Sequence, residues 1–360
     1  YEVYVNGKTL TTRNIVVGTG ARPAIPLIKG IENVDFLTSD TIWNIRKQPD
    51  KLLVLGGGPI GSELTQAFAR LGSSVTQVQR NKRLLPKEDP EVSQMLLESF
   101  QNDGINVLTA HTPKRFFKRD GKDFLKCESN GTSVEIEFDT LLLSLGRKAN
   151  TTGYGLEELG IELTQKKTIK VDAYMKTNIP NIYACGDVAG PYQFTHIAAH
   201  QAWYCAVNSM ISPFYGFKVD YSTVPWSTFT DPEVARSGLN EQEAKEQGIP
   251  YEVTTYGIDD LDRAITDEAA HGIVKVLTVP RKDKIIGVTI AGLHAGDIIA
   301  EYVAAMKNGF GMNAILGTIH IYPTLAESNK FAAGNWKKNN VSEKTLAWGE
   351  RINRWRRDYF

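Results

Sequence analysis

The 360-residue sequence predicts an α/β fold in which a strand–helix–strand unit precedes a smaller α+β region. The apolar run 52–55 leads directly into the glycine-rich turn 56–61, and residues 62–71 follow with a helical pattern. A second strand at 74–79 lies at the spacing of a β-α-β unit. Farther along, residues from about 220 to 340 alternate strand and helix patterns. These features predict a Rossmann-like unit with an additional α+β domain.

The N-terminal segment has the pattern of the end of a sheet. Residues 2–10 are predicted to form two short strands joined by the hairpin turn Asn6-Gly7, and residues 14–23 a buried strand that ends in glycines. These strands need neighbours that the sequence does not supply, and the chain starts at Tyr1 instead of methionine. We therefore expect that the chain has been truncated at its N-terminus.

The turn after the first buried strand of the β-α-β unit carries Gly56, Gly58 and Gly61. The first glycine of such a turn allows its tight bend, the second lets backbone approach a pyrophosphate, and the third permits close helix–strand packing. The helix N-terminus adds free N–H groups and a positive dipole end. A glycine-rich turn without a ligand is the alternative, but the flanking strand and helix favour a dinucleotide site.

The end of the second strand predicts which dinucleotide is bound. Sites selective for NADH usually place an acidic residue there, whereas arginine accommodates the 2′-phosphate of NADPH. The position is Gln79, and Arg80, Lys82 and Arg83 follow it. With no carboxylate and three cations nearby, we predict NADPH, and NADH is the alternative nucleotide. The alternative to phosphate binding is that these residues form a solvated basic loop.

The elements that follow alternate between helix and short strands. A helix is expected over residues 90–103, and the further strands at 105–108, 114–118, 124–128, 133–138 and 141–147. Residues 181–188 are predicted to form a short strand that ends at Gly186-Asp187, followed by a helix over 197–210. An aspartate at such a junction is able to accept a hydrogen bond from a cofactor hydroxyl, although Gly-Asp is also an ordinary turn. In the last region we expect paired strands at 272–279 and 284–291 and a helix over 296–308.

The bulk composition excludes several classes of function. The formal net charge is zero, which speaks against a nucleic-acid partner, and no apolar stretch reaches membrane-spanning length. The cysteines Cys127, Cys185 and Cys205 lie far apart and match neither a disulfide framework nor a metal site. We interpret Cys185 and Cys205 as buried small side chains and not as redox partners. Cysteines without a disulfide framework fit the reducing environment of the cytoplasm.

Taken in order, the motifs resemble those of the pyridine nucleotide–disulfide oxidoreductases, with the closest match among mercuric reductases and dihydrolipoamide dehydrogenase-like members. The segments that carry the resemblance are 17–23, 56–61, 144–147, 181–187 and 225–238. The resemblance implies FAD- and NAD(P)-binding Rossmann-like domains, the first of them incomplete, and a C-terminal α+β dimerisation domain. The implied ranges are 1–45 and 147–217 for FAD, 46–146 for NAD(P), 218–340 for dimerisation, and 341–360 for an amphipathic tail.

The resemblance also implies roles for individual residues. Gly146 and Arg147 would lie at the return crossing into the FAD domain, and Gly186 and Asp187 in the second FAD motif, with Asp187 holding the ribityl chain. Arg80 sits where NADPH-using members place an arginine for the 2′-phosphate. Glu63 matches a glutamate that pairs with a lysine near the flavin, although a carboxylate in a first helical turn is also favoured by the helix dipole.

The resemblance implies an acceptor site around residues 318–327. Tyr322 stands where dithiol-using members place a histidine, and a free tyrosine is a much weaker base at neutral pH. Glu327 would support Tyr322 across a dimer. His320 is two residues earlier and, in an extended segment, would point to the same side as Tyr322. It is a candidate base, and a packed or interface histidine is the alternative.

Two departures from the family pattern shape the predicted function. The sequence has neither the first FAD glycine loop with its redox cysteine pair nor a C-terminal cysteine pair, so mercury detoxification is not supported. We predict an FAD-dependent oxidoreductase that passes hydride from NADPH to flavin and then to a disulfide, metal or quinone-type acceptor. The alternative is a flavin-free NADP(H)-binding and dimerisation module without turnover. We predict no resident metal.

The last residues predict an amphipathic helix. Trp348, Ile352, Trp355 and Tyr359 fall on one helical face, and arginines surround them in the run that ends at Phe360. A helix of this kind binds either the membrane surface or protein. We favour packing on the body or on a partner, and the expected assembly is a homodimer.

Overall fold

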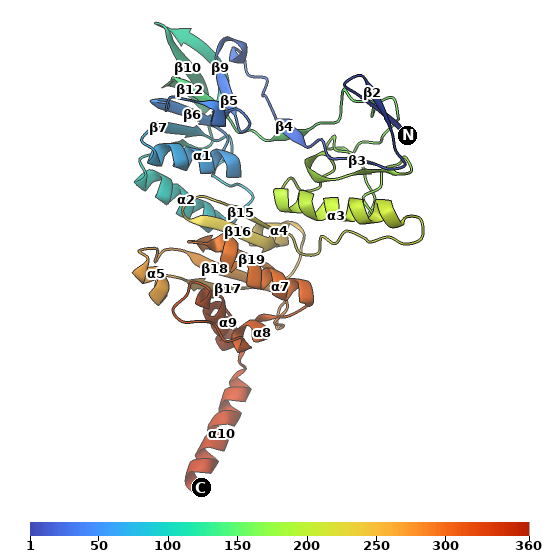
Figure 1. Ribbon diagram of the computed structural model, residues 1–360. Coiled ribbons are helices and arrows are strands. Elements are labelled where there is room, and N and C mark those ends of the chain that lie inside the picture. Colours follow the sequence, from blue (N-terminus) through green and yellow to red (C-terminus); the bar gives the residue numbers. More distant parts are fainter. Residues whose placement is uncertain (360) are drawn as a thin grey trace. The chain divides into compact units, whose positions relative to one another are not determined.

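The computed structural model describes residues 1–359 and divides into two compact units (Figure 1). Unit 1 comprises Tyr1–Gly61 and Pro113–Tyr221, and unit 2 comprises Ser62–Thr112 and Ser222–Phe360. The chain therefore passes between the units inside helix α1 (Pro59–Arg70), immediately after the glycine turn. Each unit is built from two separate stretches of chain. This division does not test the five domain ranges expected from the sequence, which stay a prediction.

Unit 1 begins with the predicted hairpin. Strands β1 (Glu2–Val5) and β2 (Lys8–Thr11) pair antiparallel. Asn6 and Gly7 connect them with φ angles of 50° and 76°, so both residues adopt the left-handed conformation that a tight hairpin turn requires. The Asn-Gly signal is confirmed.

The strand before the glycine turn lies in a parallel arrangement. Strand β12 (Thr140–Leu143) pairs on one side with β5 (Phe36–Thr38) and on the other with β6 (Lys51–Leu55). The leucines and valine of β6 and β12 are at most 1% exposed, as expected for parallel strands covered on both faces. The predicted strand 141–147 is shorter than expected, because the chain leaves the sheet after Leu143 and forms β13 (Arg147–Ala149).

The remaining strands of unit 1 form three small sheets. The strands expected at 114–118, 124–128 and 133–138 form one sheet as β9 (Thr112–Arg119), β10 (Lys122–Ser129) and β11 (Thr132–Phe138). Strand β14 (Ile182–Ala184) pairs parallel with β3 (Ile15–Val17), and β13 pairs antiparallel with β4 (Ala21–Pro23). Helix α3 (Thr195–Ile211) contacts β14 and the short 3₁₀ helix η3 (Gly186–Val188). Two further 3₁₀ turns are η1 (Ile31–Asn33) and η2 (Ile42–Asn44).

The first stretch of unit 2 continues the β-α-β unit. Helix α1 leads to β7 (Ser74–Val78), and α2 (Pro90–Asn102) leads to β8 (Asn106–Leu108), which pairs parallel with β7. Pro90 starts α2 at a position that needs no donor. The apolar face of α2 buries Val92, Leu96 and Phe100. The predicted helix–strand order of this stretch is confirmed.

The second stretch of unit 2 contains a five-stranded antiparallel sheet in the order β15-β16-β19-β18-β17. The strands are β15 (Pro225–Thr228), β16 (Glu233–Gly238), β17 (Glu252–Gly257), β18 (Ile273–Thr278) and β19 (Ile285–Gly292). Two helices lie between these strands in sequence, α4 (Glu241–Glu246) and α5 (Asp262–Thr266). The helices after the last strand are α6 (Ala295–Ile298), α7 (Ala300–Asn308), α8 (Met312–Gly317), α9 (Glu327–Asn340) and α10 (Glu343–Tyr359). The expected helix over 296–308 is thus divided at Ile299, which keeps right-handed torsion angles.

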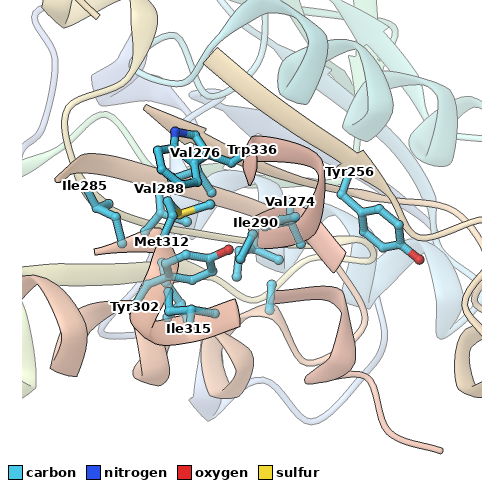
Figure 2. Close-up of a cluster of buried hydrophobic side chains, with 14 of the residues drawn as sticks. Tyr256, Val274, Val276, Ile285, Val288, Ile290, Tyr302, Met312, Ile315 and Trp336 are labelled. Atoms are coloured by element: carbon cyan, nitrogen blue, oxygen red, sulfur yellow. The ribbon is translucent and has the colours of Figure 1, made fainter. Parts of the chain in front are cut away.

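The sheet of unit 2 carries one large apolar core. Tyr302, Met312 and Ile315 from helices α7 and α8 lie against Val288 and Ile290 of the sheet (Figure 2). Each of these side chains is at most 2% exposed. Burying one of them stabilises the fold by about 1.5–3 kcal/mol, so this sheet and its helices form a rigid support for the segment 318–327 that follows α8.

A buried ion-pair network joins the two stretches of unit 2. The Nζ atom of Lys275 in β18 lies 2.8 Å from Asp89 Oδ2 and 2.6 Å from Glu241 Oε1, and it also contacts Glu91. Lys275 and Asp89 are 2% and 1% exposed. Among the described residues, Asp89, Glu91 and Glu241 are the acidic cluster whose oxygens lie close enough to share a cation. The ammonium group of Lys275 occupies that position.

The predicted amphipathic tail forms the continuous helix α10 (red, Figure 1). Trp348 and Trp355 on its predicted apolar face are 66% and 54% exposed. Packing of that face on the body of the same chain is therefore not seen in the described residues. Phe360 and the side chain of Tyr359 lie outside what the structure describes. No helix in residues 1–359 combines the length and apolar character that crossing a membrane requires.

Candidate functional site

The glycine turn has the geometry that its three glycines predict. Gly56 has a φ of 118°, and a Cβ atom there would lie 2.3 Å from the carbonyl oxygen of Ser144. A Cβ atom on Gly61 would lie 2.1 Å from the carbonyl oxygen of Gly56. Among residues 1–359, no atom would come within 4 Å of a Cβ on Gly58. Two glycines are thus required by close packing, and the backbone beside Gly58 is open to a ligand at the start of α1.

Glu63 lies in the second turn of α1 and has a partner that the sequence did not reveal. Its Oε1 atom accepts a hydrogen bond of 2.9 Å from the backbone N–H of Phe229. Burial raises the pKa of Glu63, and this hydrogen bond partly offsets the rise. No local sequence signal connects a carboxylate on α1 with a residue that follows β15. The predicted role of Glu63 near a flavin stays a prediction.

The residues directly after β7, where the sequence predicts selectivity for NADPH, present two cations. Gln79 is buried, and its backbone joins residues 108 and 111 through N–H and C=O hydrogen bonds. Arg80 and Lys82 are exposed, and neither forms an ion pair with any described residue. Arg83 differs from the expectation, because its guanidinium donates to the carbonyl oxygens of Pro86 and Glu88 and to the side chain of Gln242. The set of cations available to a phosphate is therefore Arg80 and Lys82.

Two predicted FAD residues lie together in unit 1. Arg147 Nε is 3.4 Å from Asp187 Oδ2, and the same guanidinium donates to the carbonyl oxygen of Ala21 at 2.7 Å. Gly146 and Gly186 precede these residues with φ angles of 107° and 75°. Each glycine thus sets the direction of the charged residue after it. The side chains of Arg147 and Asp187 remain 24% and 21% exposed, so a polar ligand has access to both.

Gln201 is a site residue that sequence analysis missed. Its side chain is fully buried in α3, where Oε1 accepts from the backbone N–H of Gly186 at 2.6 Å. Its Nε2 atom donates to the carbonyl oxygen of Gly190 and to the hydroxyl of Tyr221. Gln201 therefore holds both ends of the η3 turn that carries Asp187. The sequence contained one signal for this role, a polar residue within an apolar helical stretch.

The segment 318–327 contains no strand, so the condition under which His320 and Tyr322 would share one side is not met. His320 and Tyr322 were expected on one side, but the His320 side chain is 6% exposed, whereas Tyr322 is 67% exposed. His320 Nε2 is 3.0 Å from Glu301 Oε2, and its Nδ1 is 3.1 Å from the carbonyl oxygen of Thr318. The segment contains no strand, so the two-residue alternation does not apply. These contacts are those of a packed histidine, and a role as base stays a prediction.

Tyr322 and Glu327 have separate partners. The hydroxyl of Tyr322 donates to Asp262 Oδ2 at 2.8 Å, and this hydrogen bond raises the pKa of Tyr322. Glu327 is buried at the start of α9, where Oε2 accepts from the backbone N–H of Thr324 at 3.1 Å. Within one chain Glu327 therefore orders the turn after Tyr322, and its support of a partner's site stays a prediction.

Family models match most of the chain. Residues 2–202 match the pyridine nucleotide-disulphide oxidoreductase model, and residues 224–333 match the dimerisation domain of the same family. The mercuric reductase of Staphylococcus aureus is 34% identical over 94% of this chain and 61% of its own length. That of Bacillus cereus is 35% identical over 94% of this chain and 53% of its own length. The chain thus spans between half and two thirds of these relatives.

Other relatives and solved structures agree. The dihydrolipoyl dehydrogenase of Chlamydia muridarum is 33% identical over 91% of this chain and 70% of its own length. The HOCl-induced flavoprotein disulfide reductase RclA from Escherichia coli superposes with a TM-score of 0.84 and 25% identity, over 92% of this chain and 76% of that chain. The sequence-based assignment of family and fold is confirmed. The protein belongs to the pyridine nucleotide-disulphide oxidoreductase family.

Proposed function

We propose that the protein is an FAD-dependent NADPH oxidoreductase that delivers electrons to a disulfide, metal or quinone-type acceptor. The observation that supports this proposal most strongly is the glycine turn, in which Gly56 and Gly61 permit close packing while the backbone beside Gly58 stays open. Family membership implies FAD and a pyridine nucleotide as cofactors. NADPH as the specific nucleotide, and the acceptor class, are parts of the proposal.

Charge and backbone geometry support NADPH as the nucleotide. The N-terminus of α1 offers backbone N–H groups to a pyrophosphate, and the missing side chain at Gly58 lets the phosphate oxygens approach. Arg80 and Lys82 are exposed and supply positive charge for a 2′-phosphate. Gln79 cannot repel that phosphate because it carries no charge.

The residues of unit 1 fit part of an FAD molecule. Asp187 accepts hydrogen bonds only, so its partly exposed carboxylate suits a sugar or ribityl hydroxyl. Arg147 neutralises that carboxylate and fixes its direction, and Gln201 holds the turn beneath it. When bound, the flavin supplies the ability to take up hydride from a nicotinamide and release electrons singly or in pairs.

The Tyr322 hydroxyl donates its single proton to Asp262, so it offers an electron acceptor its oxygen lone pairs. Because Asp262 raises the pKa of Tyr322, its hydroxyl remains protonated at neutral pH and donates a hydrogen bond instead of removing a proton. Glu327 and Thr324 hold the backbone that follows it. This arrangement supports an acceptor that is bound by the hydroxyl oxygen, and it argues against a proton relay through residue 322.

The proposal is tested by the visible absorption spectrum of the purified protein before and after anaerobic addition of NADPH. A flavin band that bleaches on addition is expected. A colourless protein that still binds NADPH would support the flavin-free module instead. If neither a flavin band nor NADPH binding is found, both functions are wrong.

Replacing Arg80 with glutamine is expected to raise the Kd for NADPH about tenfold, which corresponds to about 1.4 kcal/mol. The change removes a charge-assisted hydrogen bond to the 2′-phosphate, so the Kd for NADH should stay the same. Titration of both nucleotides with each variant measures the ratio. Lys82→Gln is the matched control and should change the ratio less. An equal loss of NADPH and NADH affinity would contradict a 2′-phosphate site at Arg80.

We further propose that the protein is a homodimer joined through the surface of segment 318–327. Ile319 and Ile321 are 94% and 78% exposed, and Phe310 is 58% exposed. Side chains of this size on a rigid support are typical of an interface. The match to a dimerisation domain over residues 224–333 supports this assembly. Cytoplasmic location likewise remains a prediction from the reduced cysteines.

Replacing Ile319 with arginine should convert the dimer to a monomer at micromolar concentration, because a charge would be buried without a partner in the interface. Light scattering after size-exclusion chromatography measures the mass. Leu27→Arg is the control, since Leu27 is fully exposed in unit 1 and its replacement should leave the mass unchanged. If I319R keeps the wild-type mass, the interface lies elsewhere.

A further inference from the structure

The structure brings together two cysteines that are twenty positions apart in sequence. Cys185 follows strand β14, and Cys205 lies in helix α3. Both are free thiols and both are buried, with Cys185 9% exposed and Cys205 fully covered. Both belong to the same buried cluster of unit 1, and the thiol of Cys205 donates to the carbonyl oxygen of Ala184, the residue before Cys185. The sequence-based view of these residues as buried is confirmed, but their separation in sequence concealed the contact.

Contacts on either side of Cys185 independently place it against α3. The carbonyl oxygen of Ala184 lies 3.7 Å from Cys205 Sγ, and the N–H of Gly186 donates to Gln201 Oε1 at 2.6 Å. Gln201 and Cys205 are four residues apart and therefore share one face of the helix. Cys185 lies between these two residues and shares one buried cluster with Cys205.

The backbone of Cys185 is held in this position. Its N–H donates to the carbonyl oxygen of Val17 at 3.0 Å, which extends the pairing of β14 with β3 by one residue. On the β3 side the neighbour of the thiol is Gly18, where a Cβ atom would lie 3.9 Å from Cys185 Sγ. Gly18 is exposed and has no side chain, and Cys185 keeps 9% of its surface exposed whereas Cys205 keeps none, so we expect a small molecule to reach Cys185 first.

The two thiols are chemically unequal. Interaction with Cys205 lowers the pKa of Cys185, whereas interaction with Cys185 and burial raise the pKa of Cys205. The third cysteine, Cys127, is buried in β10, and burial raises its pKa to about 12. A reactive thiolate beside a second thiol is the arrangement found where disulfides form reversibly.

We propose that Cys185 and Cys205 form a reversible intramolecular disulfide when the protein meets a two-electron peroxide oxidant. The Cys185 thiolate attacks one peroxide oxygen, the O–O bond breaks, and the sulfur becomes a sulfenic acid while hydroxide leaves and is protonated to water. Cys205 sulfur then attacks Cys185 sulfur, the S–O bond breaks, and a second water leaves. Two thiols and one hydrogen peroxide thus give one disulfide and two waters, and an external dithiol reverses the change.

The disulfide would cross-link the end of β14 to the middle of α3. Asp187 follows Cys185 by two residues, so the bond would fasten the turn that Gln201 already holds. The site is therefore a modification site that couples oxidant exposure to the segment carrying Asp187. It requires neither flavin nor nucleotide, so its test is independent of the proposed function.

The test is a count of alkylated thiols after peroxide treatment of the full chain. The reduced protein is treated with hydrogen peroxide, denatured in the presence of N-ethylmaleimide and weighed by mass spectrometry. The expected count falls from the three free cysteines to one, peptide mapping finds Cys185 joined to Cys205, and dithiothreitol restores all three. Three remaining thiols at peroxide levels that oxidise an exposed thiol would overturn the proposal, as would a disulfide that contains Cys127 or joins two chains.

Variants test the order of the steps. Cys205→Ser should leave a sulfenic acid on Cys185 that dimedone captures, because no thiol remains to resolve it. Cys127→Ser is the matched control and should form the same disulfide as the wild type. Far-UV circular dichroism verifies that both variants fold. Capture of dimedone on Cys205 in Cys185→Ser, with none on Cys185 in Cys205→Ser, would overturn the assignment of the reactive thiol.

Discussion

Replacing Lys275 with methionine is expected to lower the free energy of unfolding of unit 2 by about 3–5 kcal/mol, the cost typical of leaving a buried charge without its partner. Lys275 Nζ lies among Asp89, Glu91 and Glu241, and Asp89 is 1% exposed. Methionine has nearly the volume of lysine, so the loss comes from the buried Asp89 carboxylate, which is left without its cation beside the partly exposed Glu91 and Glu241. Urea unfolding followed by tryptophan fluorescence measures the change.

Lys245→Met is the control for this substitution. Lys245 pairs with the same Glu241 at 3.3 Å, but its side chain is 67% exposed. An exposed pair contributes about 0–1 kcal/mol, so this variant should unfold almost like the wild type. Equal effects of the two substitutions would show that burial of the Lys275 network contributes nothing.

The network also predicts a dependence of stability on acid. Burial acts to raise the pKa of Glu241, but hydrogen bonds from Lys275 and Tyr251 outweigh it and lower the pKa to about 2 from an ordinary 4.5. A carboxyl whose pKa is lowered on folding stabilises the fold above its ordinary pKa, and this contribution disappears as pH falls from about 4.5 toward 2. Urea midpoints of the wild type should therefore drop over that range, and those of Lys275→Met should drop less. Parallel curves would contradict the coupling.

Replacing Gly58 with alanine is expected to weaken NADPH binding about a hundredfold, or about 2.7 kcal/mol, without lowering the melting temperature. A Cβ atom at Gly58 meets no atom of the described part of the chain within 4 Å, so the fold accommodates it. The methyl group would instead occupy the space through which the pyrophosphate approaches the backbone. Fluorescence titration with NADPH gives the Kd, and a thermal scan gives the melting temperature.

Gly61→Ala separates this effect from packing. Its Cβ atom would lie 2.1 Å from the carbonyl oxygen of Gly56, so the helix must move away from the turn. This variant should lose both nucleotide binding and thermal stability. Wild-type affinity in Gly58→Ala would mean that the turn beside Gly58 does not contact a nucleotide.

The sequence by itself determined the elements whose signals are local. The Asn6-Gly7 turn, the strand before Gly56 and the apolar face of α2 follow from patterns within a dozen residues, because turn torsions and side-chain periodicity depend on near neighbours. The order of several such motifs was specific enough to identify the family that the comparisons show. His320 marks the limit of this reasoning, since alternation predicts a side only where a strand exists.

The tertiary structure alone decided which distant side chains meet. The partners of Lys275, Glu63 and Arg147 lie 186, 166 and 40 residues away, and no spacing rule links residues at such distances. The same holds for Arg83, which folding turns away from phosphate binding, and for Cys185, which folding places against Cys205. Burial and pairing are properties of the packed chain, so charge, reactivity and access at these positions follow from the fold and not from the local sequence.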